Sequence, residues 1–202
     1  MKIIFLDIDG VLAVNYRRLE DGFGSGFHPE FVENLKRIID ATGAYLCISS
    51  TWRSSGLEKL LQMWEARQLP GFIIDITGHA HSTIMGTVNP DNPDGKWLRE
   101  ELHSLPRGVE IDHWLKKHGK FQRINWSEWE QDRMEARAHV KNYVILDDDS
   151  DMLLGQAEHF VKTSNRWNEP DAFQGYGLTT KAADEAITIL NSSLTELYYD
   201  LR

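Results

Sequence analysis

Residues 2–10 read Lys2-Ile3-Ile4-Phe5-Leu6-Asp7-Ile8-Asp9-Gly10, an apolar run that ends abruptly at two aspartates and a glycine. The run is continuously apolar rather than alternating, which is typical of a strand buried on both faces. It is too short to be the apolar part of a secretory signal. We therefore predict a buried strand over residues 2–6, with Asp7 at its carboxyl end.

Similar short apolar runs recur along the chain and predict strands over residues 44–49, 72–75, 143–146 and 159–163. Helical spacing of apolar residues predicts intervening helices over residues 28–43, 55–67, 109–118 and 180–190, the last capped by Thr180. Strands that alternate with helices favour right-handed crossovers and a parallel sheet. We expect an α/β fold, a Rossmann-like parallel sheet of about five strands with helices on both faces.

Two polar stretches, residues 76–106 and 119–142, interrupt this pattern. The first contains a dense group of turn-forming residues between Asn89 and Gly95, and the second is rich in charged residues. We predict that both are loop or lid insertions in a single domain that covers residues 1–202.

The composition is that of an ordinary globular domain, with 41% hydrophobic and 26% charged residues. A formal net charge of −9 disfavours a broad nucleic-acid surface but is compatible with one local basic groove. No stretch approaches the roughly 20 apolar residues needed to span a bilayer. We expect a soluble cytoplasmic protein that does not bind membranes. The single cysteine, Cys47, excludes an internal disulfide and lies in an apolar run, so we expect a buried thiol.

Polar clusters directly follow three of the predicted strands. They are Asp7 with Asp9, Ser49-Ser50-Thr51, and Asp147-Asp148. In open parallel sheets, ligands bind at the carboxyl ends of the strands, near the switch in strand order. We therefore expect the three clusters to meet at one edge of the sheet.

The paired aspartates predict a metal site with phosphate chemistry. Two carboxylates held close together repel, so they need a cation or a shared proton. Mg²⁺ prefers oxygen ligands, and we expect Asp7, Asp9 and Asp148 to hold it. A metal that neutralises phosphate would let Asp7 attack phosphorus and form an aspartyl-phosphate. Asp9 would protonate the leaving oxygen and later activate water.

These motifs resemble those of the haloacid dehalogenase (HAD) superfamily of phosphohydrolases. Asp7-Ile8-Asp9-Gly10-Val11 is similar to the first motif, which supplies the nucleophile and the acid/base. Ile48-Ser49 is similar to the second, which ends in a phosphate-binding hydroxyl; Ser50 and Thr51 are rival candidates. Leu146-Asp147-Asp148 is similar to the fourth, in which the second acid reaches the metal and the first supports the site. The resemblance implies a HAD-like fold.

The third motif of the superfamily carries a lysine that holds the phosphate beside the nucleophile. In the matching context this chain has Arg107, whose guanidinium can bind a phosphate through two hydrogen bonds. Lys120 and Lys141 are alternative cations.

A closer resemblance is to the HAD domains of Swiss Army Knife RNA-repair proteins. It is carried by Ser49-Ser50-Thr51-Trp52-Arg53, Tyr143 to Asp148 and Gly177-Leu178-Thr179. Trp52 could stack on a base and Arg53 could hold a second phosphate. The alternatives are that Trp52 packs against the following helix and that Arg53 pairs with a nearby acid.

Together these features predict a magnesium-dependent phosphomonoester hydrolase that acts on a nucleotide or a nucleic-acid terminal phosphate. In the superfamily, insertions called caps set substrate choice, and the inserts here predict a minimal cap or none. An open site would admit a bulky substrate, such as a nucleic-acid end or a phosphoprotein. The alternatives are a phosphoprotein phosphatase and a catalytically idle module that binds phosphate and metal, which the arginine at the third motif favours.

Overall fold

The computed structural model describes residues 1–13, 19–78, 106–118, 140–164 and 176–192. Its elements, in chain order, are β1 (Lys2–Leu6), α1 (Pro29–Thr42), β2 (Tyr45–Ile48), the 3₁₀ helix η1 (Thr51–Ser55), α2 (Leu57–Ala66), β3 (Ile73–Ile76), α5 (Arg107–His118), β4 (Asn142–Asp147), the 3₁₀ helix η2 (Leu154–His159), β5 (Phe160–Lys162) and α7 (Thr180–Asn191). The two 3₁₀ helices were not predicted from the sequence.

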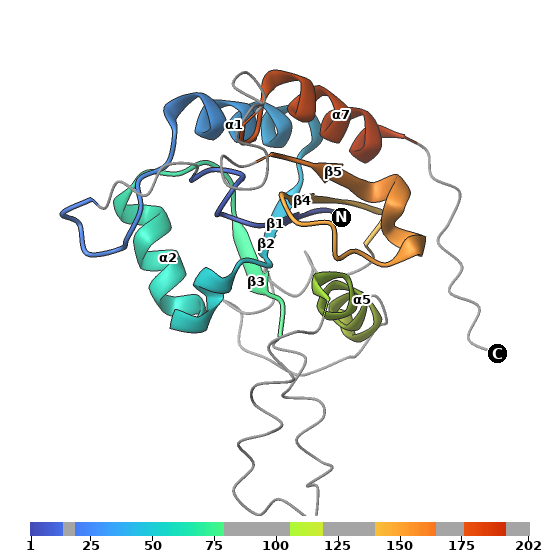
Figure 1. Ribbon diagram of the computed structural model, residues 1–202, viewed down its shortest axis with the longest axis horizontal. Helices are drawn as coiled ribbons and strands as arrows, with labels where there is room; N and C mark the ends of the chain where they lie inside the picture. The colour runs from blue at the N-terminus through green and yellow to red at the C-terminus, as the bar shows by residue number, and fades with distance from the viewer. Residues whose placement is uncertain (14–18, 79–105, 119–139, 165–175, 193–202) are drawn as a thin grey trace, which may run out of the picture.

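The five strands form one sheet in the order β3-β2-β1-β4-β5, and every neighbouring pair is parallel. The chain builds outward from β1 through β2 to β3 and then crosses to the other side of β1 for β4 and β5 (Figure 1). The strand order therefore switches between β1 and β4. The predicted α/β fold with a five-stranded parallel sheet is confirmed.

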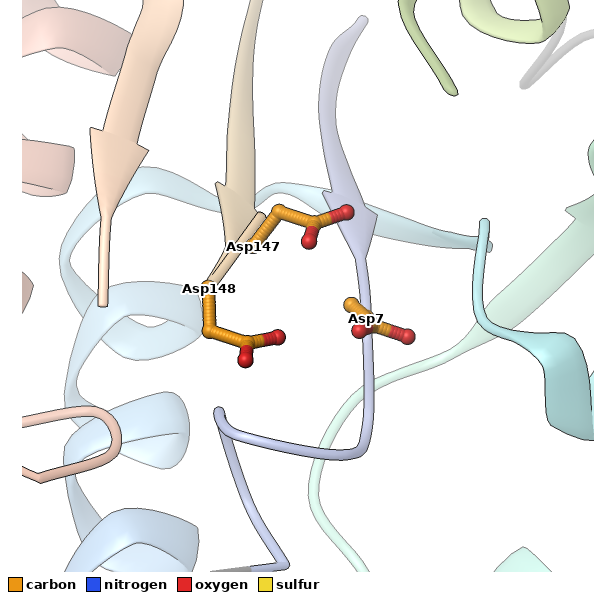
Figure 2. A group of neighbouring side chains, drawn as sticks. All are labelled: Asp7, Asp147 and Asp148. Carbon is orange, nitrogen blue, oxygen red and sulfur yellow. The ribbon is translucent and has the colours of Figure 1, made fainter. Parts of the chain in front are cut away.

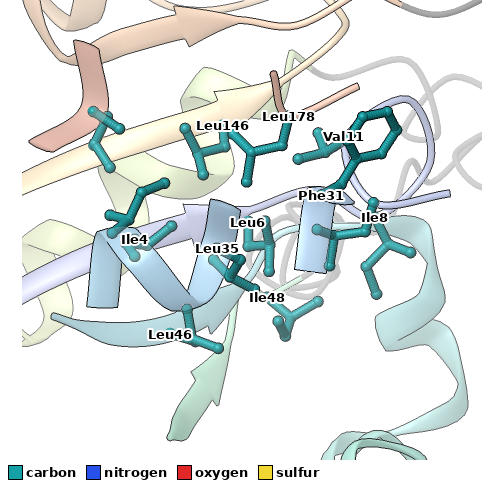
Figure 3. Close-up of a cluster of buried hydrophobic side chains, with 14 of the residues drawn as sticks. Ile4, Leu6, Ile8, Val11, Phe31, Leu35, Leu46, Ile48, Leu146 and Leu178 are labelled. Carbon is teal, nitrogen blue, oxygen red and sulfur yellow. The ribbon is translucent and has the colours of Figure 1, made fainter. Parts of the chain in front are cut away.

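Alternate residues of β1 face opposite layers of the molecule. Ile4 and Leu6 pack in an apolar cluster with side chains of α1, α2 and α7. Figure 3 shows them near Phe31 and Leu35 of α1. Ile3 and Phe5 pack in a second cluster with side chains of α5, on the other face of the sheet. All four are fully buried, which explains why the strand is continuously apolar.

The helix ends follow local chemistry. α1 begins at Pro29 and is followed by Gly43, whose φ of 64° and N–H bond to the Ile39 carbonyl (2.8 Å) form the expected left-handed cap. The cap of α7 is Thr179, not Thr180, because the Thr179 hydroxyl accepts the Ala182 N–H at 3.2 Å. The sequence prediction of this cap was wrong by one residue, since adjacent threonines have the same capping propensity.

Most of the two predicted insertions, 76–106 and 119–142, lies outside the described residues, as does Lys120. Their loop or lid character, and the single domain that would contain them, stay predictions. No helix among the described residues has the length and apolar character required to cross a membrane.

Candidate active site

The backbone pairing of the sheet extends to the residues that follow the strands. The Asp7 N–H donates to the Leu146 carbonyl at 2.9 Å, and the Ser49 N–H donates to the Leu6 carbonyl at 3.0 Å. These bonds tie the ends of β1, β2 and β4 into one register. The structure thereby brings the three predicted polar clusters together at the carboxyl edge of the sheet, at the switch in strand order.

Three carboxylates converge there, one from the end of β1 and two from the end of β4 (Figure 2). One oxygen from each of Asp7, Asp147 and Asp148 lies within 4.8 Å of the other two. Their exposed fractions are only 6%, 0% and 9%. Burial, reinforced by the negative charge of Asp7, raises the pKa of Asp147 well above its usual range. The Asp147 Oδ2 atom accepts no hydrogen bond from the described residues.

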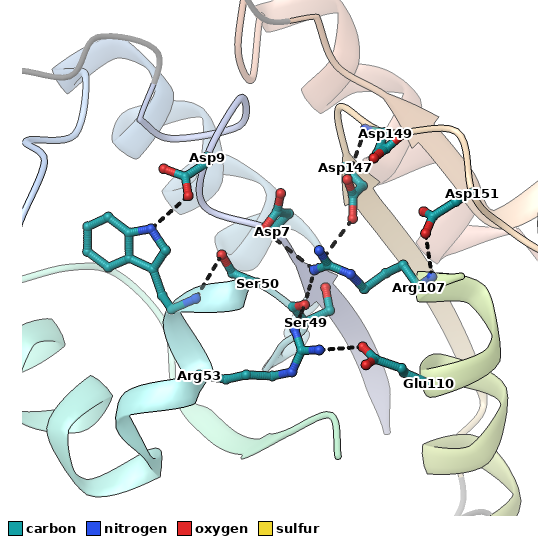
Figure 4. A network of polar contacts seen from close by, with 11 residues as sticks. Asp7, Asp9, Ser49, Ser50, Arg53, Arg107, Glu110, Asp147, Asp149 and Asp151 are labelled. Atoms are coloured by element: carbon teal, nitrogen blue, oxygen red, sulfur yellow. Dashed lines mark hydrogen bonds and ion pairs between the residues drawn. The ribbon is translucent and has the colours of Figure 1, made fainter. Parts of the chain in front are cut away.

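The carboxylate of Asp9 is not one of the three that converge, and its predicted role as a metal ligand stays a prediction. Its Oδ2 accepts a hydrogen bond from the Trp52 indole N–H at 2.9 Å (Figure 4). Burial raises the pKa of Asp9, against the opposing effect of the Trp52 bond. The chain leaves strand geometry after Asp7. Ile8 is fully buried, and its carbonyl accepts the Leu12 and Ala13 N–H groups, both at 2.9 Å.

Gly10 allows Asp148 to approach this turn. Its φ is +74°, in the left-handed region that favours glycine. A Cβ at this position would lie 2.3 Å from the Asp148 Cγ atom, so no larger residue fits without displacing that carboxylate. The Thr163 hydroxyl donates to the Gly10 carbonyl at 2.9 Å and anchors the turn beside β5.

Arg107 supplies the cation of the site. Its Nη1 lies 3.6 Å from Asp7 Oδ1 and 3.9 Å from Asp147 Oδ2, and it also donates to the Ser49 carbonyl (Figure 4). Burial works against the charged form of Arg107, but the attraction of Asp7 and Asp147 prevails and raises its pKa. The Arg107 backbone N–H donates to Asp151 Oδ2 at 2.6 Å, which fixes the first turn of α5.

Of the two other candidate cations, Lys141 lies away from Asp7 and Asp147. Lys141 is exposed and precedes β4, and its N–H donates to the Met1 carbonyl at 2.7 Å. It therefore lies at the amino edge of the sheet, opposite the acidic cluster. Lys120 is not among the described residues.

Arg53 pairs with an acid, as one of the two sequence interpretations proposed. Its Nη2 lies 2.5 Å from Glu110 Oε2, and the two side chains are only 5% and 9% exposed. Its Nη1 donates to the Ser49 carbonyl, so Arg53 and Arg107 share one acceptor. Sequence reasoning missed Glu110, because a glutamate on a helix is ordinarily a solvent-exposed residue and nothing in its spacing indicates a partner on η1.

The hydroxyls at this edge have different surroundings. The Ser50 hydroxyl accepts the Trp52 backbone N–H at 3.4 Å and so caps η1. Ser49 is fully buried, and its hydroxyl has no hydrogen-bond partner among the described residues. Thr77, which follows β3, is also buried, and its hydroxyl likewise has no hydrogen-bond partner among the described residues. Thr77 was not identified as a site residue from the sequence. Of the two predicted serines, Ser49 has the uncommitted hydroxyl.

A comparison with protein families matches residues 3–167 to the HAD domain in Swiss Army Knife RNA repair proteins. The chain belongs to this family. The resemblance predicted from the motifs is confirmed, and the protein is a phosphatase or hydrolase of the HAD superfamily. The match includes every residue of the acidic cluster as well as Arg107, whereas α7 follows it. Searches of the curated proteins and of the solved structures find no significant match.

The close contact at Gly10 predicts a selective effect of a single methyl group on this HAD domain. Gly10→Ala should lower phosphatase activity on the order of 10²-fold, because the methyl group displaces the Asp148 carboxylate. Gly43→Ala is the matched control, since Gly43 has a similar φ of 64° but open space around its Cβ position. Both variants should lose about 1–2 kcal/mol of stability from the left-handed backbone. Gly10→Ala should lose more than this because its methyl group also meets Asp148, and only Gly10→Ala should lose activity. Equal activity of the two folded variants would contradict this role of Gly10.

The buried ion pair of Arg53 predicts a large loss of stability on truncation of its partner. Glu110→Ala should lower the free energy of unfolding by about 3–5 kcal/mol, because it leaves a buried guanidinium without its counter-charge. Urea denaturation measures this. The control is Asp112→Ala on the same helix, whose partner Lys116 is half exposed and whose removal should cost only about 0–1 kcal/mol. A loss in Glu110→Ala no larger than the control's would show that the pair contributes little.

Proposed function

We propose that the protein is a magnesium-dependent phosphomonoester hydrolase that works through an aspartyl-phosphate on Asp7. The observation that carries this proposal is the position of the Asp7 carboxylate. It is nearly buried at the switch point of the sheet, beside the carboxylates of Asp147 and Asp148 and 3.6 Å from the Arg107 guanidinium. A carboxylate that has both further acids and a cation as neighbours is suited to meet a metal-bound phosphate group.

The acidic cluster fits Mg²⁺ by the chemistry of its donors. All three residues offer carboxylate oxygens, the hard ligands that this ion prefers, and the unbonded Oδ2 of Asp147 lies among them. Asp7 and Asp148 would hold the ion, with Asp147 in support. When bound, the ion would neutralise phosphate charge and so make phosphorus accessible to an anionic nucleophile.

Each residue of the site has a separate role in the proposed reaction. Asp7 attacks phosphorus, and the bond from phosphorus to the leaving oxygen breaks as the aspartyl-phosphate forms. Asp9 gives its proton to that oxygen and later takes a proton from the water that hydrolyses the intermediate. Arg107 and the uncommitted Ser49 hydroxyl would bind the phosphate oxygens.

The substrate class is part of the proposal. The matched family belongs to RNA repair proteins, and this supports a nucleotide or nucleic-acid terminal phosphate as the substrate of this chain. A phosphoprotein phosphatase is the second candidate within the same chemistry. A catalytically idle module is the alternative outside it, and the placement of Arg107 beside Asp7 weighs against it.

Replacement of the nucleophile gives the first test. Asp7→Asn should abolish hydrolysis of p-nitrophenyl phosphate, with a loss of at least about 10³-fold, because an amide cannot attack phosphorus. The matched control is Asp149→Asn, which makes the same change in an exposed residue outside the acidic cluster and should keep full activity. The wild-type protein should turn over this substrate with Mg²⁺ and not with a chelator. Undiminished activity of Asp7→Asn would refute the assignment, and a wild-type protein without turnover would support the idle module.

The substrate class has its own test. Oligonucleotides with a terminal 3′-phosphate should be hydrolysed with a higher kcat/KM than phosphopeptides. Their kcat/KM should also fall as salt rises, because contacts to backbone phosphates release counterions. A small phosphate ester, measured in parallel, has no backbone and should respond less. A preference for phosphopeptides would favour the phosphoprotein alternative.

A further inference from the structure

Trp52 is the residue that the structure connects to Asp9. Its indole N–H donates to Asp9 Oδ2 at 2.9 Å, and this is the one hydrogen bond that the described residues make to that carboxylate (Figure 4). The bond joins two parts of the chain that are 43 residues apart, the turn after β1 and the 3₁₀ helix after β2. A side chain this remote in sequence can hold Asp9 only if it is itself held in place.

The indole is fixed by contacts on several sides. The Trp52 backbone N–H is bound by the Ser50 hydroxyl, and its ring packs against Phe27 with 5.6 Å between the ring centroids. The Arg67 guanidinium lies over both rings, 5.9 Å from the centroid of Trp52 and 4.8 Å from that of Phe27. Arg67 is in turn bound to Asp21 at 2.7 Å and to the Ser25 carbonyl at 2.8 Å. The loop before α1 and the end of α2 therefore hold the indole in one orientation.

The direction of this hydrogen bond restricts what the carboxyl group of Asp9 can do. An indole N–H donates and never accepts, so Oδ2 must present a lone pair to it. A proton held by the carboxyl group is then favoured on the other oxygen, Oδ1, because an unprotonated carboxyl oxygen is the better acceptor for the indole N–H. Trp52 thus selects which oxygen of Asp9 is an acceptor and which is available to a leaving group, and it limits rotation of the carboxyl plane.

We propose that Trp52 is a positioning residue that orients the carboxyl group of Asp9 for proton transfer to the leaving group. This inference rests on the proposed function, in which Asp9 is the acid/base. It assigns the indole a role other than the base stacking considered from the sequence, since the indole N–H is bound to Asp9 and the ring packs against Phe27.

The test compares two substrates that differ in how much they need a proton. A nitrophenolate leaves readily as an anion, whereas the alkoxide of glycerol phosphate requires protonation. Trp52→Phe keeps an aromatic ring and removes the donor together with the five-membered ring that carries it. It should lower kcat/KM for glycerol phosphate by about tenfold or more, since misplaced acid/base groups forfeit part of a 10²–10⁴-fold contribution, and change kcat/KM for p-nitrophenyl phosphate little. The parameter kcat/KM includes no step after the leaving group departs, so hydrolysis of the aspartyl-phosphate does not enter.

Trp64→Phe is the matched control. The Trp64 indole N–H also donates to an oxygen, the Pro70 carbonyl at 3.0 Å, and its ring also packs near Phe27, at 6.4 Å. The same substitution in the same aromatic group should leave the ratio of the two kcat/KM values unchanged. The ratio is independent of the fraction of folded enzyme, because both substrates are assayed on one preparation. An equal loss on both substrates in Trp52→Phe, or a changed ratio in Trp64→Phe, would overturn the inference.

Asp9→Asn separates the inference from the proposed function. If Asp9→Asn selectively loses the alkyl substrate and Trp52→Phe does not, Asp9 is the acid and the positioning role of Trp52 is wrong. If Asp9→Asn shows no selective loss, the acid role of Asp9 fails and the inference fails with it. In the double variant, Trp52→Phe should add no further selectivity to Asp9→Asn, because it acts through the proton of Asp9.

Discussion

The parallel pairing of β1 between β2 and β4 is the constraint on which the rest of the structure depends. β1 is buried on both faces, so its register against its neighbours is set by two apolar clusters at once. The same ladder of backbone hydrogen bonds runs on to Asp7 and Ser49 and fixes where these residues leave the sheet. A slip of one residue would move Asp7 away from Asp147. The register of β1 therefore determines both the packing of the core and the geometry of the site.

The acids at this edge of the sheet concentrate negative charge in a buried place, which is unfavourable unless positive charge compensates it. Asp7, Asp147 and Asp148 are all nearly buried, and Arg107 supplies one compensating charge. Burial and, after it, the negative charge of Asp7 raise the pKa of Asp147, because both favour its neutral form. A bound dication would remove the same imbalance without a proton. The chemistry of the acidic cluster is therefore that of a cation site.

The sequence predicts the strands and the position of the site because β1 and its neighbours are each encoded by a short, local run of apolar residues. Continuous apolar runs locate the strands, and the residue after each run locates the edge where Asp7, Ser49 and Asp147 meet. The contacts of Asp9 and Arg53 depend instead on turns and on partners far along the chain. Residues two apart share a face only while a strand continues, and the chain leaves that geometry at Ile8. No spacing rule connects Asp9 to Trp52 or Arg53 to Glu110, so these pairs required the fold.

An arginine at the third-motif position is consistent with this network rather than a defect in it. The single nitrogen Nη1 of Arg107 faces Asp7, Asp147 and the Ser49 carbonyl, so it places a positive charge where a lysine ammonium would place one. Arg53 donates to the same carbonyl, and its charge is compensated separately by Glu110. Two guanidinium groups thus hold the strand end that carries the Ser49 hydroxyl, and among the described residues Arg107 is the one that forms an ion pair with Asp7. This arrangement preserves the electrostatic role of the missing lysine, and for that reason favours a working phosphatase over an idle relative.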